Sequence, residues 1–355
     1  MDNVAIIAIT KNGICTADSL KKHFPSWKIF VPSKFHQEGK NIEWFEESTT
    51  LKIKELFESY SALVCIFSLG AVIRLIAPHM KDKKTDPAVV VIDDTAKFVI
   101  STLSGHLGGA NELTEKIAST LNATPVITTA ADVNKTIAVD LLGKEFGWSI
   151  DENSSVTKVS AFMVNEEKIG VFQDAGEKDW WLPKKELPQN VHIYKSLNEL
   201  VESDCKGFLI ISDKIIDDNE IQNRSVIYRP KTLVVGVGLH WDTDKDTIRE
   251  GMNFCLSKFN LSSKSIAKFA SIKKEVDVKG LQELSQEMNV PIEYFDKAVL
   301  STINIPNPSD VVQTFEGTAS VSEAAAIKAS GGGELIVQKH KFPPNLTIAI
   351  ARRSN

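Results

Sequence analysis

The sequence predicts a multi-domain α/β protein: a mostly parallel α/β domain at the N-terminus, a small irregular middle domain and an α/β domain at the C-terminus. The chain has 355 residues, which is enough for two or three compact units at about 100–200 residues each. Its 43% hydrophobic and 25% charged residues are typical of globular proteins. In the first 148 residues, short β-branched runs alternate with longer stretches of helical period, as in buried parallel strands joined by helices.

The first domain is expected over residues 1–148. Apolar β-branched runs predict its strands, and apolar residues at helical spacing predict its helices. The strands are expected at residues 4–9, 62–67, 88–92 and 125–128, with a further strand at 98–101 that pairs with 89–92 through a turn at 93–96. The helices are expected at residues 51–60, 71–79, 108–121 and 139–146.

A change in composition after residue 148 marks the middle domain, which is expected over residues 149–229. This stretch is richer in charge, carries prolines and has weak periodicity, and it therefore predicts irregular structure. Its last strands are expected at 206–212 and 225–228. The segment 229–231 is expected to form a hinge, because the residue before a proline is disfavoured in helical geometry.

The C-terminal domain is expected over residues 230–355, opening with a strand at 233–237. Apolar periodicity predicts its helices, and the three glycines at 331–333 are a helix stop signal. The helices are expected at residues 243–255, 281–288 and 321–329, and the closing strands at 335–337 and 347–351.

The composition excludes several classes of protein. The net charge is -5, so the chain as a whole is not a basic nucleic-acid-binding surface, and no nucleic-acid partner is expected. No apolar stretch approaches the roughly 20 residues needed to cross a bilayer, and the N-terminus lacks the pattern of a secretion signal, so no membrane partner is expected. The four cysteines form no C-x-x-C pair. These features predict a cytoplasmic location.

The candidate active site of the first domain is a glycine-rich loop, SGHLGGAN, at residues 104–111, between an expected strand and an expected helix. Glycines let a ligand approach the backbone, and the amides at a helix start, with about half a positive charge, suit a phosphate or a carboxylate. An imidazole has a reference pKa of about 6.5, so His106 is the candidate catalytic proton carrier. The alternative is that the glycines only form a turn, to which His106 is hydrogen-bonded. The candidate substrate-binding residues of the loop are Ser104, Gly105, Gly108, Gly109 and Asn111.

Two neighbouring loops are expected at the same edge of the sheet, because ligands of open parallel sheets bind beyond the carboxyl ends of the strands. The loop at 68–70 leads into the helix that carries Arg74, and the loop at 128–135 contains Asp132 and Lys135. Arg74 and Lys135 are candidates to bind anionic groups of a substrate, and Asp132 is a candidate catalytic base. The alternatives are solvated side chains for the two cations and a turn or cap residue for Asp132.

The sequence lacks the motifs of nucleotide-binding, zinc-binding and nucleophilic catalytic sites. Gly236 and Gly238 end a predicted strand, but Trp241 stands where the third glycine of G-x-G-x-x-G would be, and no P-loop motif occurs. No nucleotide cofactor is therefore expected. Gly238 is kept only as a candidate substrate-binding residue. The histidines form no zinc-binding pattern, and no metal site built by the protein is expected. No G-x-S-x-G occurs, and Cys65 and Cys255 lie in apolar or helical surroundings, so nucleophilic catalysis has no candidate.

The end of the chain is locally basic. Beyond Glu334 there is no acidic residue, and among the cations that gather there Lys339 and Lys341 are candidate substrate-binding residues. Such a patch suits a polycarboxylate, and the alternative is a terminus that only increases solubility. Glu323 is a further candidate for binding substrate. Its alternative is a helix-capping role, because Ser320 and Glu323 have the spacing of a capping box.

Eight stretches of the chain carry a family resemblance: LGAVIRLIAP at 69–78, KKTDPAVV at 83–90, LSGHLGGAN at 103–111, PVITTA at 125–130, GVG at 236–238, PNPS at 306–309, SEAAA at 322–326 and residues 339–351. With these stretches the chain resembles, over nearly its whole length, the cobalt-precorrin-5A hydrolase family of the anaerobic cobalamin pathway. The resemblance is weak in the middle domain. At 239–242 this chain has Leu-His-Trp-Asp where the family commonly has cysteine followed by arginines. If those arginines bind a substrate carboxylate, His240 or the basic patch has to replace them.

The resemblance implies hydrolysis of the ring A lactone of a cobalt-bearing tetrapyrrole, with loss of a methylated meso carbon as acetaldehyde and formation of cobalt-precorrin-5B. It implies a hydrolase that acts on a carbon–carbon bond without a cofactor, because the corrinoid substrate carries the cobalt. It also implies transient contact with other enzymes of the cobalamin pathway. The alternative is a non-catalytic corrinoid-binding or handover protein of the same pathway.

Overall fold

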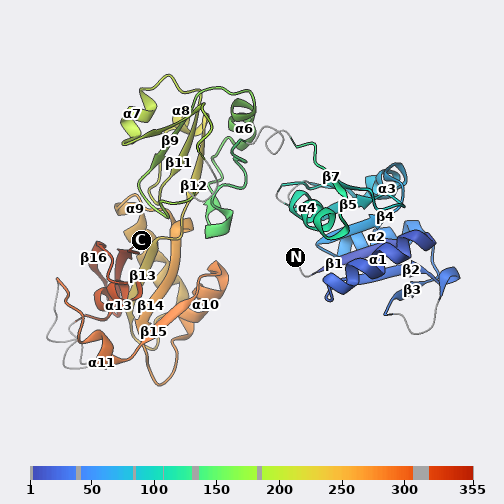
Figure 1. The fold of residues 1–355 in the computed structure, drawn as a ribbon. Coiled ribbons are helices and arrows are strands. Elements are labelled where there is room, and N and C mark those ends of the chain that lie inside the picture. The colour runs from blue at the N-terminus through green and yellow to red at the C-terminus, as the bar shows by residue number, and fades with distance from the viewer. Residues whose placement is uncertain are drawn as a thin grey trace. The chain divides into compact units, whose positions relative to one another are not determined.

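The structure of the protein is a computed structural model, which describes residues 3–36, 41–82, 85–106, 108–129, 136–181, 186–306 and 320–354 (Figure 1). The chain divides into two compact units, Met1–Leu141 and Leu142–Asn355, which run from blue to teal and from green to red in Figure 1. The described residues form a seven-stranded sheet in the first unit and two five-stranded sheets in the second, so the predicted multi-domain α/β fold is confirmed. The domain limits at residues 148 and 229 stay a prediction.

The first unit is built on a mostly parallel sheet. Its strands are β1 Val4–Ala8, β2 Lys28–Pro32, β3 Glu43–Phe45, β4 Ala62–Ile66, β5 Ala88–Ile92, β6 Phe98–Leu103 and β7 Thr124–Val126. They lie in the order β3-β2-β1-β4-β5-β6-β7. Every residue of β1, β4 and β5 is buried, because these three apolar strands are covered on both faces.

Helices cover both faces of this sheet. One face packs against α1 Lys11–His23 and α4 Ala110–Leu121, and the other packs against α2 Thr49–Ser59 and α3 Leu69–Ile76. Local signals start two of these helices: the hydroxyl of Thr10 accepts the amide of Gly13 at the start of α1, and Ser48 has the same role in α2. Short 3-10 turns lie at Ser33–Phe35 and Ala77–His79.

The direction of β6 divides the loops of the first unit between two edges of its sheet. β6 runs antiparallel to β5, and β7 runs parallel to β6. The carboxyl ends of β6 and β7 therefore lie at the edge where β5 begins, and the carboxyl ends of β1, β4 and β5 lie at the opposite edge. The hydroxyl of Ser104, which follows β6, accordingly donates to the carbonyl of Asp86, which precedes β5.

The second unit begins with a sheet in which four strands are parallel. Its order is β10-β9-β11-β12-β8, and β8 alone pairs antiparallel. This sheet is more regular than the irregular middle domain that we expected, because its strands are short and two of its helices have only five and four residues, too few to show a clear apolar period. Its elements are β8 Ser149–Ile150, α6 Val156–Val164, β9 Ile169–Gln173, β10 Val191–Tyr194, α7 Leu197–Val201, β11 Gly207–Ile211, α8 Asn219–Gln222 and β12 Ser225–Arg229.

The last sheet combines parallel and antiparallel strands in the order β15-β14-β13-β17-β16. β13, β14 and β15 are parallel, and β17 runs antiparallel to both of its neighbours. One face packs against α9 and α10, and α13 packs on the other. The elements are β13 Leu233–Leu239, α9 Lys245–Lys258, a 3-10 turn at Ser263–Ser265, β14 Ile266–Ile272, α10 Lys279–Met288, β15 Ile292–Phe295, α11 Lys297–Leu300, α13 Val321–Ala329, β16 Leu335–Phe342 and β17 Leu346–Arg352.

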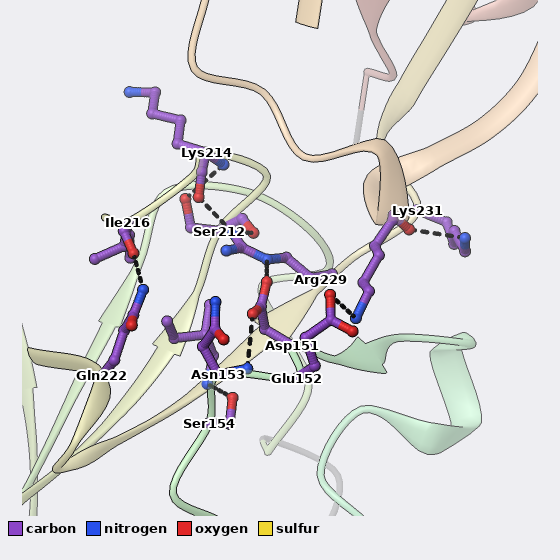
Figure 2. Close-up of polar contacts among 12 residues, drawn as sticks. Asp151, Glu152, Asn153, Ser154, Ser212, Lys214, Ile216, Gln222, Arg229 and Lys231 are labelled. Atoms are coloured by element: carbon purple, nitrogen blue, oxygen red, sulfur yellow. Dashed lines mark hydrogen bonds and ion pairs between the residues drawn. The ribbon is translucent and has the colours of Figure 1, made fainter. Parts of the chain in front are cut away.

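One expectation about the connections is wrong. The helix expected at 139–146 is a turn followed by a 3-10 turn at Lys144–Phe146, because Gly143 and Gly147 take left-handed φ values of 76° and 74° that a helix does not accommodate. The hinge expected at 229–231 stays a prediction; its first residue, Arg229, is buried in β12 and held within the first sheet of the second unit. Its guanidinium donates to the carboxylate of Asp151 at 2.8 Å and to the carbonyls of Ser212 and Lys214 (Figure 2).

Candidate functional site

The glycine-rich loop of the first unit connects β6 to α4 in a conformation that requires glycine. Ser104 has a left-handed φ of 55° and Gly109, at the start of α4, has a φ of 83°. A Cβ on Gly108 would lie 2.7 Å from the carbonyl oxygen of Ser104, and a Cβ on Gly105 would lie 2.7 Å from Oδ1 of Asn111. These contacts are too short for any side chain, so the loop is compact because its glycines are bare.

Three backbone amides of the loop are hydrogen-bonded within it. Gly109 donates to the carbonyl of His106 at 3.0 Å, Ala110 to that of Ser104 at 3.1 Å and Asn111 to that of Gly105 at 3.0 Å. We expected the amides at this helix start to bind a phosphate or a carboxylate. The structure uses these three amides to close the loop instead, and Gly109 therefore has a structural role here.

Side chains of the loop tie it to neighbouring strands. Asn111 is buried; its Nδ2 donates to the hydroxyl of Thr129 at 2.9 Å, and its Oδ1 accepts from Ser101 at 2.6 Å. Since Thr129 follows β7, the loops after β6 and β7 lie together, as we predicted. Asp132 and Lys135, the candidates on the second of these loops, lie outside the described residues.

His106 is paired with a carboxylate that the sequence analysis missed. Nδ1 of His106 lies 3.3 Å from Oδ1 of Asp140, and the two side chains are 14% and 22% exposed. A carboxylate at Nδ1 orients an imidazole and stabilises its charged form, which makes the pair suited to moving a proton. No local signal marks Asp140, because 34 residues separate it from His106 and only the folded chain brings them together.

Arg74 does not join this group. It lies on α3, which begins at the carboxyl edge of β4 and packs on the face of the sheet opposite to α4. Its guanidinium donates to the carbonyl of Gly70 at 3.1 Å, back toward the start of its own helix. The expectation that the loop at 68–70 shares an edge with the glycine-rich loop is wrong, because β6 is antiparallel to β5.

The second unit brings Gly238, Glu323 and Lys339 together on the face covered by α13. Gly236 and Gly238 allow the helix to lie directly on β13: a Cβ on Gly236 would stand 1.9 Å from the carbonyl oxygen of Ser322, and one on Gly238 would stand 3.4 Å from Cβ of Val321. The glycine pair therefore serves close packing between a helix and a strand rather than phosphate binding.

Glu323 is fully buried in the first turn of α13 and holds a bulge of β16. Its Oε1 accepts the backbone amide of Lys339 at 3.0 Å, where the pairing of β16 with β17 shifts register. The capping-box alternative is wrong, because the hydroxyl of Ser320 makes no capping bond. Burial and the charge of Lys341 lower the pKa of Lys339, against the attraction of Glu323.

A separate pocket of about 690 Å³ lies at the carboxyl edge of β13 and β14, beside α9 and α10. Trp241, 72% exposed, and Val276 provide its apolar surface. Nδ1 of His240 lies 2.7 Å from Oδ1 of Asp242, which lines the pocket, so this imidazole is already paired with a carboxylate of the protein. An anionic ligand is disfavoured in this pocket, because its charged lining residues are mostly acids: Asp242, Asp244, Lys245, Asp277, Lys279 and Glu283.

The buried thiols are poor nucleophiles. Burial raises the pKa of Cys65 to about 12 and that of Cys255 to about 11, so neither forms appreciable thiolate near neutral pH.

Among the described residues, no three His, Cys, Asp or Glu side chains gather closely enough to hold a metal ion. Within the same part of the chain, no helix combines the length and the apolar character needed to cross a membrane.

Comparisons with known proteins agree along the chain. Family models described as Cobalamin synthesis G N-terminal, Cobalamin biosynthesis central region and Cobalamin synthesis G C-terminus match residues 52–132, 137–230 and 233–351. Cobalt-precorrin-5A hydrolase from Priestia megaterium is 42% identical over 98% of this chain and 94% of that protein. The enzyme of the same name from Salmonella typhimurium is 29% identical over 99% of this chain and 98% of that protein.

A solved structure also aligns with the chain. It is titled "Crystal structure of a putative cobalamin biosynthesis protein G homolog from Sulfolobus solfataricus" and covers 99% of this chain and 98% of its own, at 23% identity. The TM-score is 0.38, which is too low to carry a structural argument.

Proposed function

Because this chain belongs to the cobalt-precorrin-5A hydrolase family of cobalamin biosynthesis, we propose that it opens the ring A lactone of cobalt-precorrin-5A and releases acetaldehyde, giving cobalt-precorrin-5B. The reaction consumes one water. The lactone is cleaved at its acyl carbon, the bond to the methylated meso carbon breaks, and the macrocycle takes up the electron pair. The enzyme is thereby a hydrolase acting on a carbon–carbon bond.

One observation carries this proposal: the 42% identity to the Priestia megaterium enzyme extends over nearly the whole of both chains. The match therefore includes both compact units, and with them the glycine-rich loop and the face around α13. A protein that shared only one domain with a hydrolase would support a much weaker proposal.

We assign the proton transfers to His106. The imidazole takes a proton from the attacking water and returns it as the lactone oxygen leaves, a role that typically contributes about 10²–10⁴-fold to a rate. Asp140 is its positioning residue, since its carboxylate lies 3.3 Å from Nδ1 and fixes the orientation of the ring. The catalytic role of Asp132 and the substrate-binding role of Lys135 remain part of the proposal, and Arg74, at the opposite edge of the sheet, is not assigned to this site.

We propose that the reaction needs no cofactor of the protein. Hydrolysis exchanges no electrons with an external carrier, and the cobalt arrives within the substrate. The substrate-binding role of the second unit falls to Lys339 and Lys341, while Gly238 and Glu323 keep the structural roles described above. The cytoplasmic location and the transient contact with other enzymes of the pathway belong to the same proposal.

The test is an anaerobic incubation of the purified protein with cobalt-precorrin-5A, without added cofactor. We expect acetaldehyde and cobalt-precorrin-5B in equal amounts, measured by derivatisation of the aldehyde and by mass spectrometry of the corrinoid. Unchanged substrate that co-elutes with the protein would replace this proposal with the non-catalytic carrier. Activity that appears only after a nicotinamide cofactor is added would contradict both.

A further inference from the structure

The start of α13 contains hydrogen-bond donors that no other described residue satisfies. Ser320 and Ser322 are 1% and 0% exposed, and neither hydroxyl has a hydrogen-bond partner within the part of the chain that the structure describes. The backbone amides of Val321 and Ser322 also have no acceptor among the described residues. Three consecutive residues thus contain two buried hydroxyls and two amides of the first helical turn that have no hydrogen-bond partner among the described residues.

This arrangement differs from an ordinary helix start. A serine at the cap position normally accepts an amide of the first turn, but Ser320 makes no such bond. Buried polar groups without partners are rare in native proteins, and a group of them in one place indicates an acceptor that occupies the site when it is bound. The aligned peptide dipoles of this nine-residue helix add about half a positive charge there, which favours an anion.

The position of this helix start fits a ligand site. α13 runs antiparallel to β13, and the bare backbone of Gly236 and Gly238 lets its first turn lie against the carboxyl end of that strand. In open α/β sheets, ligands bind at this edge. Two cations are carried by β16 beside the same turn: Lys339, whose amide is held by Glu323, and Lys341, which is exposed.

The surrounding charges favour a singly charged anion. Glu323 is fully buried in the first turn of the helix, so a doubly charged phosphate would meet strong repulsion there. A carboxylate carries one charge and two oxygens, which can accept from the amides on one side and the hydroxyls on the other. The cobalt tetrapyrrole substrate carries acetate and propionate arms that end in this group.

We infer that the start of α13 is a subsite for a carboxylate arm of the tetrapyrrole, bound by Ser320, Val321 and Ser322 and flanked by Lys339 and Lys341. The inference rests on the proposed function for the identity of the ligand. The two hydroxyls and two amides donate to the arm, and the ammonium groups offset its charge. The subsite anchors the macrocycle and takes no part in the chemical step.

The test combines Ser320→Ala and Ser322→Ala in one variant of the full chain, with uroporphyrin III as a carboxylate probe. Each hydrogen bond to a charged acceptor is strong, so we expect the dissociation constant, measured by the shift of the Soret band, to rise about 10-fold or more. The KM for cobalt-precorrin-5A should rise with it while kcat stays within about two-fold. The melting temperature should not fall, because the variant removes hydroxyls that have no partner in the protein.

The matched control is Ser265→Ala, which removes another buried hydroxyl without a partner in the second unit. Ser265 precedes β14 and so lies at the opposite edge of the sheet, and we expect it to leave probe affinity unchanged. Unchanged affinity and KM in the double variant would overturn the inference, while acetaldehyde release by the unmodified protein would still uphold the proposed function. Loss of binding to inorganic phosphate, with porphyrin affinity intact, would also overturn it and identify an inorganic anion site.

Discussion

Arg352 of β17 donates two hydrogen bonds to the fully buried carboxylate of Asp213, from Nε to Oδ2 at 2.8 Å and from Nη2 to Oδ1 at 2.7 Å. The hydroxyl of Thr232 adds a third bond to Oδ2 at 2.9 Å. Asp213 lies just after β11 of one sheet, and Arg352 lies in the other sheet of the second unit. The two sheets are therefore joined by a charged contact in which the carboxylate is fully buried and the arginine side chain is 25% exposed.

Asp213→Asn should destabilise the second unit. The substitution keeps the size of the side chain but leaves the guanidinium of Arg352 without its counter-charge, which for a buried pair typically costs about 3–5 kcal/mol. We expect the free energy of unfolding in urea to fall by about 3 kcal/mol. The control is Glu287→Gln, at the exposed bidentate pair with Arg249, where little change is expected. Equal stability of Asp213→Asn and the parent would show that the contact contributes nothing.

Asp140→Asn should lower kcat about 10²-fold or more with little change in KM, because it removes the charge beside Nδ1 of His106 and leaves the binding groups intact. The acid limb of the pH profile of kcat should move to lower pH as well, because the substitution removes a carboxylate that stabilises the charged imidazole. His106→Gln should abolish the limb. The control is His23→Gln, on the exposed end of α1, with parent kinetics. A parent-like kcat in Asp140→Asn would remove Asp140 from the mechanism.

Lys341→Gln should weaken binding of uroporphyrin III at low ionic strength and much less at high ionic strength. Lys341 is exposed, and attraction between exposed charges is screened over about 10 Å at 0.1 M salt. Titrations at low and high potassium chloride measure this difference. Lys279→Gln, at a side chain that is 88% exposed and paired with Glu283, should bind like the parent at both concentrations. A salt-independent loss in Lys341→Gln would indicate a packing role instead.

Cys65 should make the protein less stable in alkali. Burial raises its pKa in the folded protein from 9.0 to about 12, so above pH 9 the unfolded thiol ionises while the folded one does not. The unfolded state then binds fewer protons, and the free energy of unfolding falls as pH rises. Urea denaturation at a series of pH values should show a shallower fall for Cys65→Ala than for Cys15→Ala, whose side chain is exposed. Equal slopes would contradict the assignment.

Much of the fold could be predicted from the sequence where the signal is local. The strands at 62–66, 88–92 and 207–211 are continuous apolar runs, and the structure buries every residue of them. β14 was missed because Lys268 and Ser271 interrupt its apolar pattern. α1 was missed because lysines and polar residues dominate it and leave few buried positions. Such elements take their structure from what they pack against.

The sequence by itself determined the α/β class, the buried strands, the compact glycine-rich loop and the basic end of the chain, because each depends on neighbouring residues. The sequence also predicted that β6 pairs with β5 through a short turn, and the structure has this antiparallel pairing, but only the tertiary structure showed that its direction separates Arg74 from His106. It alone also decided that Asp140 reaches His106 and that Glu323 holds the bulge at Lys339. These contacts join residues distant in the chain, and the order and direction of strands that create them follow from the packing of whole sheets and helices.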